Sequence, residues 1–156
     1  MIQHIWTIPC RVSITDRETN NISMIEVLEE ITLPTALEQQ PDSQLVPAIF
    51  DVITLWGRQN DETPESGFGR FQLVSPSGEA LMTYEYDVDL QVHQRRRILG
   101  RLIGFPLVPA GKYRFQVERR HDRDAVWEIV ATIPIAIRHG QVRAEPSGNG
   151  HQPEAR

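Results

Sequence analysis

Apolar and polar residues alternate along much of this chain with the two-residue period of a half-buried β-strand. The clearest stretch runs from Pro109 to Ile137, where a Pro-Ala-Gly turn leads into two alternating arms. The apolar face of this expected hairpin consists of Tyr113, Phe115, Val117, Trp127, Ile129, Ala131, Ile133, Ile135 and Ile137. An apolar face of this length must be covered, so the hairpin predicts a second sheet packed against it.

Six further segments have the pattern of strands, and none has the length and period that favour a helix. They cover about 5–14, 22–33, 48–56, 68–74, 80–90 and 95–105. The segment 22–33 is expected to place on one face Ile25, Val27, Ile31 and Leu33. Its Met24, Leu28 and Ile31 also fit a short helix. In the segment 95–105, Gly100 and Gly104 indicate a bulge or a close backbone approach.

Eight short strands with turn residues between them are typical of an all-β protein. The predicted fold is an antiparallel two-sheet β-sandwich of about seven to eight strands, immunoglobulin-like in architecture. The intersheet disulfide of antibody domains is absent, because Cys10 is the single cysteine. The domain is expected to span residues 1–137. Residues 138–156 hold no large apolar residue after Val142, so they are expected to form a disordered tail.

Three short sequence features support a comparison with known proteins. They are Gly57 after an apolar segment, Ser77-Gly78-Glu79 in a turn, and the run from Pro109 to Phe115 before a strand with Trp127. With these motifs, most of residues 1–137 resembles a family of small uncharacterised bacterial β-sandwich proteins of immunoglobulin-like or C2-like architecture. The resemblance implies a fold, and the family has no assigned catalytic residues to carry over.

Length and composition are those of one globular domain. The chain has 156 residues, of which 40% are hydrophobic, and this length suffices to bury a core. No apolar stretch is long enough for a membrane-spanning helix. The beginning of the sequence lacks the basic and apolar regions of a secretory signal. These features predict a cytoplasmic protein without a membrane partner.

Charge is divided unevenly between the two parts of the chain. Residues 1–92 hold 15 acidic and four basic residues, net −11, whereas residues 93–156 hold six acidic and 12 basic residues, net +6. Such a division favours cross-strand ion pairs and self-association. In particular, Glu85, Asp87 and Asp89 are expected to face the arginines 95–97 across a tight hairpin, with Glu85 within reach of Arg101 in one register.

Six arginines are the candidate partner-binding residues: Arg95, Arg96, Arg97, Arg119, Arg120 and Arg123. A phosphate or RNA site would need aromatic side chains beside them. The nearby Tyr113 and Phe115 are expected in the core instead, and the net charge of −5 opposes a surface for polyanions. A protein partner or a second copy is therefore expected, and nucleic acid is not.

Four acidic loop residues are the candidate metal ligands: Asp61, Glu62, Asp122 and Asp124. If each strand runs antiparallel to the one before it, their loops emerge at the same end of the sandwich. Oxygen ligands from several loops suit a calcium ion. The paired Asp-x-Asp runs of C2 domains are missing, so a solvated rim is the preferred interpretation and no cofactor is expected.

No motif indicates catalysis. Ser75-Pro-Ser-Gly is a turn, and Cys10 has no neighbours in sequence that would lower its thiol pKa. The predicted function is therefore that of a non-enzymatic protein-interaction or assembly module, which binds a protein partner or itself. The alternative is a module that binds a small ligand or a divalent metal with the loops at one end.

Overall fold

The computed structural model describes residues 1–34, 45–106 and 108–140, and every regular element within these ranges is a β-strand. The strands are β1 (Ile2–Thr15), β2 (Ile22–Val27), β3 (Glu30–Pro34), β4 (Leu45–Arg58), β5 (Glu65–Val74), β6 (Ala80–Leu90), β7 (Arg95–Pro106), β8 (Gly111–Arg120) and β9 (Glu128–Gly140). The all-β class expected from the alternation is confirmed. The described ranges contain nine strands, because the segment 22–33 forms two.

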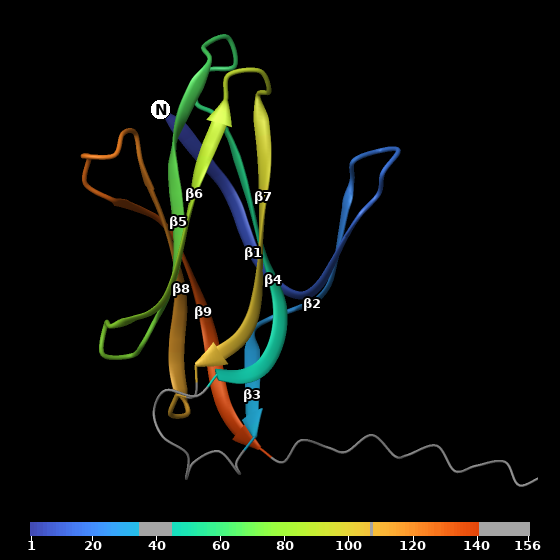
Figure 1. Ribbon diagram of the computed structural model, residues 1–156, viewed down its shortest axis with the longest axis vertical. Coiled ribbons are helices and arrows are strands. Elements are labelled where there is room, and N and C mark those ends of the chain that lie inside the picture. The colour runs from blue at the N-terminus through green and yellow to red at the C-terminus, as the bar shows by residue number, and fades with distance from the viewer. Residues whose placement is uncertain (35–44, 107, 141–156) are drawn as a thin grey trace, which may run out of the picture.

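The strands form two sheets that pack on each other (Figure 1). Sheet A has the order β2-β1-β4-β7, and sheet B has the order β3-β9-β8-β5-β6. Neighbouring strands are antiparallel except β3 and β9, which run parallel, so the expectation of a wholly antiparallel structure is wrong at this pair. β4 and β7 curve at the lower end of the view, which gives sheet A its curl.

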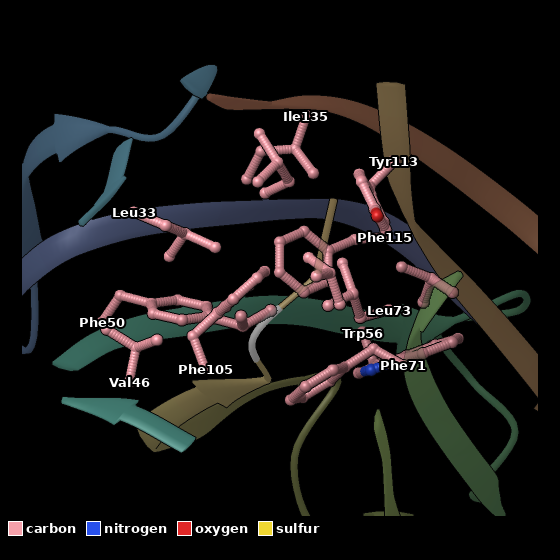
Figure 2. Close-up of a cluster of buried hydrophobic side chains, with 14 of the residues drawn as sticks. Leu33, Val46, Phe50, Trp56, Phe71, Leu73, Phe105, Tyr113, Phe115 and Ile135 are labelled. Atoms are coloured by element: carbon pink, nitrogen blue, oxygen red, sulfur yellow. The ribbon is translucent and has the colours of Figure 1, made fainter. Parts of the chain in front are cut away.

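A shared hydrophobic core joins the inner faces of the two sheets (Figure 2). Phe50 of sheet A lies 6.0 Å from Phe115 of sheet B, measured between ring centroids. At the other end of the core, Trp56 of sheet A lies 6.4 Å from Tyr86 of sheet B. Such tilted aromatic contacts add to the hydrophobic stabilisation of both sheets.

The β8–β9 hairpin confirms the alternation seen in the sequence, with two exceptions. Its inner residues Tyr113, Phe115, Val117, Ile135 and Ile137 are buried, and Ala131 and Ile133 pack partly against the core. Ile129 and Trp127 were expected on the same face, but Ile129 is 57% exposed and Trp127, just before β9, contacts the guanidinium groups of Arg70 and Arg120 instead of the core.

A β-bulge in the β8–β9 ladder explains the exposure of Ile129. Val117 lies opposite Ala131, but the next residue, Glu118, lies opposite Ile129. The extra residue in β9 is Val130, which packs against the core in place of Ile129. One additional residue reverses the alternation beyond it.

The segment 22–33 is neither one strand nor a helix. The Leu28 amide donates to the Pro9 carbonyl oxygen and closes the ladder between β2 and β1, whereas the Ala136 amide donates to the Glu29 carbonyl oxygen and begins the ladder between β9 and β3. The chain therefore crosses from sheet A to sheet B at residues 28–29. As a result Leu33 is buried in the core, while Ile25 and Val27, expected on the same face, are exposed.

β6 and β7 follow each other in the chain but lie in different sheets, so the expected tight hairpin between them is wrong. Glu85 instead lies 3.8 Å from Arg70 and 3.7 Å from Arg120, both of sheet B. At Gly100 of β7 the backbone comes close to the facing sheet, as the glycine in the sequence indicated. A Cβ at this position would lie 2.8 Å from the ring of Phe71 in the facing sheet.

The last described strand extends past the expected end of the domain at residue 137. Arg138, His139 and Gly140 pair with β3, and the Arg138 guanidinium lies 2.7 Å from the Glu30 carboxylate. The rest of the expected tail, residues 141–156, lies outside the described residues. Within the ranges that the structure describes, no helix has the length and apolarity needed to cross a membrane.

Candidate functional site

The hairpin formed by β1 and β2 bends back over the outer face of sheet A. The Ser13 amide and hydroxyl both donate to Asp51 Oδ2 of β4, at 3.0 and 2.6 Å. Near the tip of the hairpin, Arg97 of β7 donates to Asn20 Oδ1 at 2.6 Å. Asp51 lies on β4 and Arg97 on β7, the last two strands in the order of sheet A. These contacts therefore hold the hairpin against sheet A.

Asp51 is the central residue of this attachment. Its side chain is almost completely buried, and Arg101 donates two hydrogen bonds to it, at 2.8 and 3.2 Å. The hydrogen bond from Arg101 lowers the pKa of Asp51, against the opposite effect of burial, and the Ser13 hydrogen bonds lower it further. A carboxylate held in this way favours the folded state only while it is ionised.

We expect the attachment of the hairpin to weaken in acid. The folded-state pKa of Asp51 lies below the unfolded value of about 3.9, so its stabilising contribution is present above that value and is lost as the pH falls through the folded-state pKa. The free energy of unfolding of Asp51→Asn should therefore lie below that of the wild type at pH 7, and the difference should shrink below about pH 4. Urea titrations across this range measure both quantities.

The exposed Asp124→Asn is the matched control for this experiment, because Asp124 forms no ion pair within the described part of the chain. It should track the wild type at every pH. A gap between wild type and Asp51→Asn that stays constant down to pH 2 would contradict the role assigned to the Asp51 carboxylate.

The outward side of the hairpin carries four aliphatic side chains, which we call the hairpin face: Val12, Ile14, Ile25 and Val27. Val12 lies directly opposite Ile25 in the ladder, and the other two lie two residues farther along their strands. Their exposed fractions are between 42% and 55%. The alternate residues Ser13 and Met24 are half-buried toward sheet A. The hairpin thus presents a contiguous apolar face that no described residue covers.

An apolar groove adjoins the hairpin face at Val27. It has a volume of about 600 Å³ and lies between β1 and β9, with Pro9, Leu28, Ile133 and Ile135 among its lining residues. β2 pairs only with the second half of β1, and β3 pairs only with the end of β9. The groove opens between these two pairings, where the facing sides of β1 and β9 have no neighbouring strand. Pro9 and Pro134 line it and lack the amide hydrogen that an added strand would need.

The six candidate arginines are divided between the two sheets. Arg95, Arg96 and Arg97 lie on β7 of sheet A, whereas Arg119 and Arg120 lie on β8 of sheet B, with Arg123 in the turn that follows. Arg119 donates to Glu128 Oε2 at 3.0 Å and to the Ile2 carbonyl oxygen at 2.6 Å. Its interactions therefore hold the fold together.

Arg120 belongs to a stack of cations and rings on the outer face of sheet B. Its guanidinium carbon lies 4.2 Å from the ring centroid of Trp127, and Arg70 lies 4.3 Å from the same ring. Phe68 is 5.4 Å from Arg120 and 5.6 Å from Arg123. Cation–π contacts of this kind fasten the β8–β9 turn to the sheet. Of the candidate arginines, Arg95, Arg96 and Arg123 are exposed and have no ion pair in the described ranges, and Arg123 lies over the Phe68 ring.

The four candidate metal ligands lie in two loops that point in different directions (Figure 1). Asp122 Oδ1 accepts from the amides of Asp124 and Ala125, which closes the β8–β9 turn on itself. In the β4–β5 loop, the Asp61 carbonyl oxygen accepts from Arg58 at 2.8 Å. No three His, Cys, Asp or Glu side chains among the described residues are arranged to hold a metal ion.

A buried polar chain between the sheets escaped the sequence analysis. Thr7 donates to Thr54 at 2.8 Å, and a hydrogen bond of 2.8 Å joins Thr7 to His4 Nε2. Burial, aided by the charge of Arg119, lowers the pKa of His4. No local pattern marks these residues, because only the pairing of β1 with β4 brings them together.

No protein-family model matches this chain, and a search of curated proteins finds no match either. The functional interpretation therefore rests on the surfaces described above.

Proposed function

We propose that this protein acts without catalysis, as a module that binds another protein through the hairpin face. The observation that carries the proposal is the contiguous set of four half-exposed aliphatic side chains on two paired strands. Contiguous exposed apolar clusters of this kind mark interaction sites on proteins. The groove beside Val27 extends the apolar surface, so a partner contacting both would bury more area than the hairpin face alone provides.

The titratable groups support a function without catalysis. Cys10 is fully buried, and burial, aided by the charge of Asp51, raises its thiol pKa. A thiol in this state is a poor nucleophile. Burial also raises the pKa of Tyr86 to about 12. Thr7 lines the groove and lies beside His4. Its hydroxyl donates to Thr54, however, so His4 Nε2 is a donor to Thr7 and is not placed as its base. The geometry of this pair therefore does not favour an enzyme.

The proposed architecture is immunoglobulin-like. β1, β4 and β7 of sheet A occupy the places of strands A, B and E, and β5, β8 and β9 of sheet B occupy those of C, F and G. The Tyr113 hydroxyl donates to the Pro109 carbonyl oxygen at 2.9 Å. A tyrosine near the start of strand F that bonds back to the preceding corner is a feature of that fold. This support concerns the fold, and the binding function is argued from the hairpin face.

Site-specific photocrosslinking tests the proposed binding surface. A benzophenone amino acid at Ile25 places the reactive group in the hairpin face, and the same amino acid at Val126, which is 90% exposed on the β8–β9 turn, is the matched control. In cells that naturally express the chain, we expect one discrete adduct from position 25 and none from position 126. Val12→Asp in the same chain should remove that adduct.

The partner identified from the adduct is then purified and titrated. Val12→Asp should weaken its binding at least about tenfold, since a charge replaces an apolar contact that becomes buried. It should leave the urea midpoint of the isolated protein unchanged. Adducts of equal yield from positions 25 and 126, or a partner that binds Val12→Asp as well as the wild type, would overturn the proposal.

A further inference from the structure

Each sheet ends in an open strand edge on the side away from β2 and β3. β6 ends sheet B and β7 ends sheet A, so neither has a neighbouring strand beyond it. The Arg58 amide donates to the Gln94 carbonyl oxygen. In the alternating antiparallel ladder that follows, the backbone groups of the odd-numbered residues 95–101 therefore point away from β4, toward the open edge. β7 offers these groups to an additional strand.

The two edges carry opposite charges. The outer side of β6 carries Glu85, Asp87 and Asp89, all exposed, and the exposed Arg95 and Arg96 begin β7. Glu85 is shared with Arg70 and Arg120 within the chain. By contrast, none of Asp87, Asp89, Arg95 and Arg96 has an ion-pair partner in the ranges that the structure describes. Arg123 lines the same hollow as Asp87 and Asp89, and Glu62 the same hollow as Arg95, but none of these groups is close enough to form an ion pair. Each edge thus keeps charges that are available to a second copy.

We propose that two copies of this chain form a dimer in which β6 of each pairs with β7 of the other. β6 runs toward the 91–94 connection and β7 runs away from it, so the two strands are antiparallel within one chain. A two-fold axis parallel to the strands then places β6 antiparallel to β7 of the second copy, and the same operation creates the second contact. Both contacts set an acidic edge against a basic one.

The orientation of the side chains agrees with this arrangement. Asp87 and Asp89 lie on the outer face of sheet B, because Val88 and Leu90 between and beside them are buried. Arg95 has the same parity as Arg101, whose side chain lies on the outer face of sheet A over Asp51. In the joined sheet, the acidic side chains of one copy and Arg95 of the other therefore share a face. Opposite charges on neighbouring strands attract on such a face.

Charged residues on edge strands also protect proteins against unwanted pairing. Protection of that kind works best when both edges have the same sign, since identical copies then repel each other. Here the two edges attract when they meet in antiparallel register. Electrostatic association of this type weakens with added salt, because exposed charges are screened over about 8 Å at physiological ionic strength.

Charge exchange between the edges provides the test. One variant carries Asp87→Arg with Asp89→Arg, and the other carries Arg95→Glu with Arg96→Glu. Each variant alone sets like charges against each other in both contacts, so its dimer dissociation constant should rise at least about tenfold over the wild type. Mixed in equal amounts, the two variants should form a heterodimer. In one contact the basic β6 of the first variant meets the acidic β7 of the second, and in the other contact the native β7 of the first meets the native β6 of the second. Native mass spectrometry distinguishes the three species by mass.

The control variant carries Glu79→Arg with Asp124→Arg, two exposed residues of the β5–β6 and β8–β9 turns, which makes the same change of charge as the β6 variant away from Arg95 and Arg96. It should dimerise as the wild type does, and circular dichroism should show the same strand content for all variants. Wild-type protein that is monomeric at 100 µM, or a dimer that survives both charge reversals, would overturn the edge pairing. Neither result bears on the hairpin face, which is tested by its own crosslink.

The proposed dimer leaves the hairpin face free. β2 lies at the end of sheet A opposite β7, and the hairpin reaches β7 only with its turn, where Asn20 accepts from Arg97. The exposed side chains of the hairpin face therefore remain accessible when the β6 and β7 edges are joined. A dimer would then present two hairpin faces to a partner, which raises its avidity for any partner with repeated sites. The two inferences are independent, since the edge pairing uses none of the hairpin residues.

Discussion

Replacing Arg70 by methionine is expected to lower the free energy of unfolding by about 3 kcal/mol or more, because it leaves a buried carboxylate without its partner. Glu118 has a side chain that is only 6% exposed, and it pairs with Arg70 and accepts from Gln116 Nε2 at 2.6 Å. The Arg70 guanidinium is also one of the two cations stacked on Trp127. The change therefore removes an ion pair and a ring contact together. Urea denaturation at pH 7 measures the loss.

The double variant Arg70→Met with Glu118→Gln separates the two effects. Removing the carboxylate should recover much of the loss, since an amide is less costly to bury than an unpaired charge. Arg114→Met is the matched control. Arg114 lies on the same side of β8 as Glu118 but forms no ion pair with any described residue. If Arg70→Met proves no more harmful than Arg114→Met, the buried pair does not have the assigned role.

Gly69→Ala is expected to destabilise the fold by about 1–3 kcal/mol through overpacking. Gly69 of β5 lies directly opposite Tyr86 of β6, and a Cβ at position 69 would lie 2.4 Å from Cε2 of the Tyr86 ring. That ring is also packed 6.2 Å from Phe71 and 6.4 Å from Trp56, between centroids. Because the half-buried ring is packed against these neighbours, the added methyl group must displace it and disturb the aromatic cluster.

Gly111→Ala provides the comparison, since a Cβ there would be no closer than 3.5 Å to another residue. This variant should unfold at the wild-type urea concentration. Tyr86→Leu should be less harmful in the Gly69→Ala background than in the wild type, because it removes the ring that the new methyl group meets. Additive losses in the double variant would show that the contact between position 69 and the ring is not the cause.

Strand positions were readable from the sequence because the alternation of side chains is a local property. The burial of one side of β8 needs only the strand's own residues, so Tyr113, Phe115 and Val117 were placed correctly. Ile129 was misplaced because the bulge opposite Glu118 shifts the register by one residue. A bulge depends on how two strands fit together, and no residue type in this stretch announces it.

The candidate surfaces were less predictable than the strands. Val12 with Ile14 and Ile25 with Val27 flank a polar turn symmetrically, a pattern that signals two paired apolar strands. It does not state which side of the pair faces the protein. Here the hydrogen bonds of Ser13 to Asp51 turn the aliphatic side outward. Likewise, the acidic and basic charges of β6 and β7 were evident, but a four-residue connection between two strands is compatible with pairing within a sheet or with crossing between sheets.

The all-β class, the approximate extent of most strands, the core residues of β8 and the unequal charge of the two parts of the chain could all be read from the amino-acid order. They follow from the two-residue period and from composition, which are properties of short segments. Three features came from the folded structure alone: the segment 22–33 divides between the sheets, the β1–β2 hairpin folds over sheet A, and β6 and β7 form open edges of opposite charge. These arrangements depend on contacts between residues distant in the chain, such as Arg97 with Asn20 and Arg101 with Asp51, whose energies a local pattern does not encode.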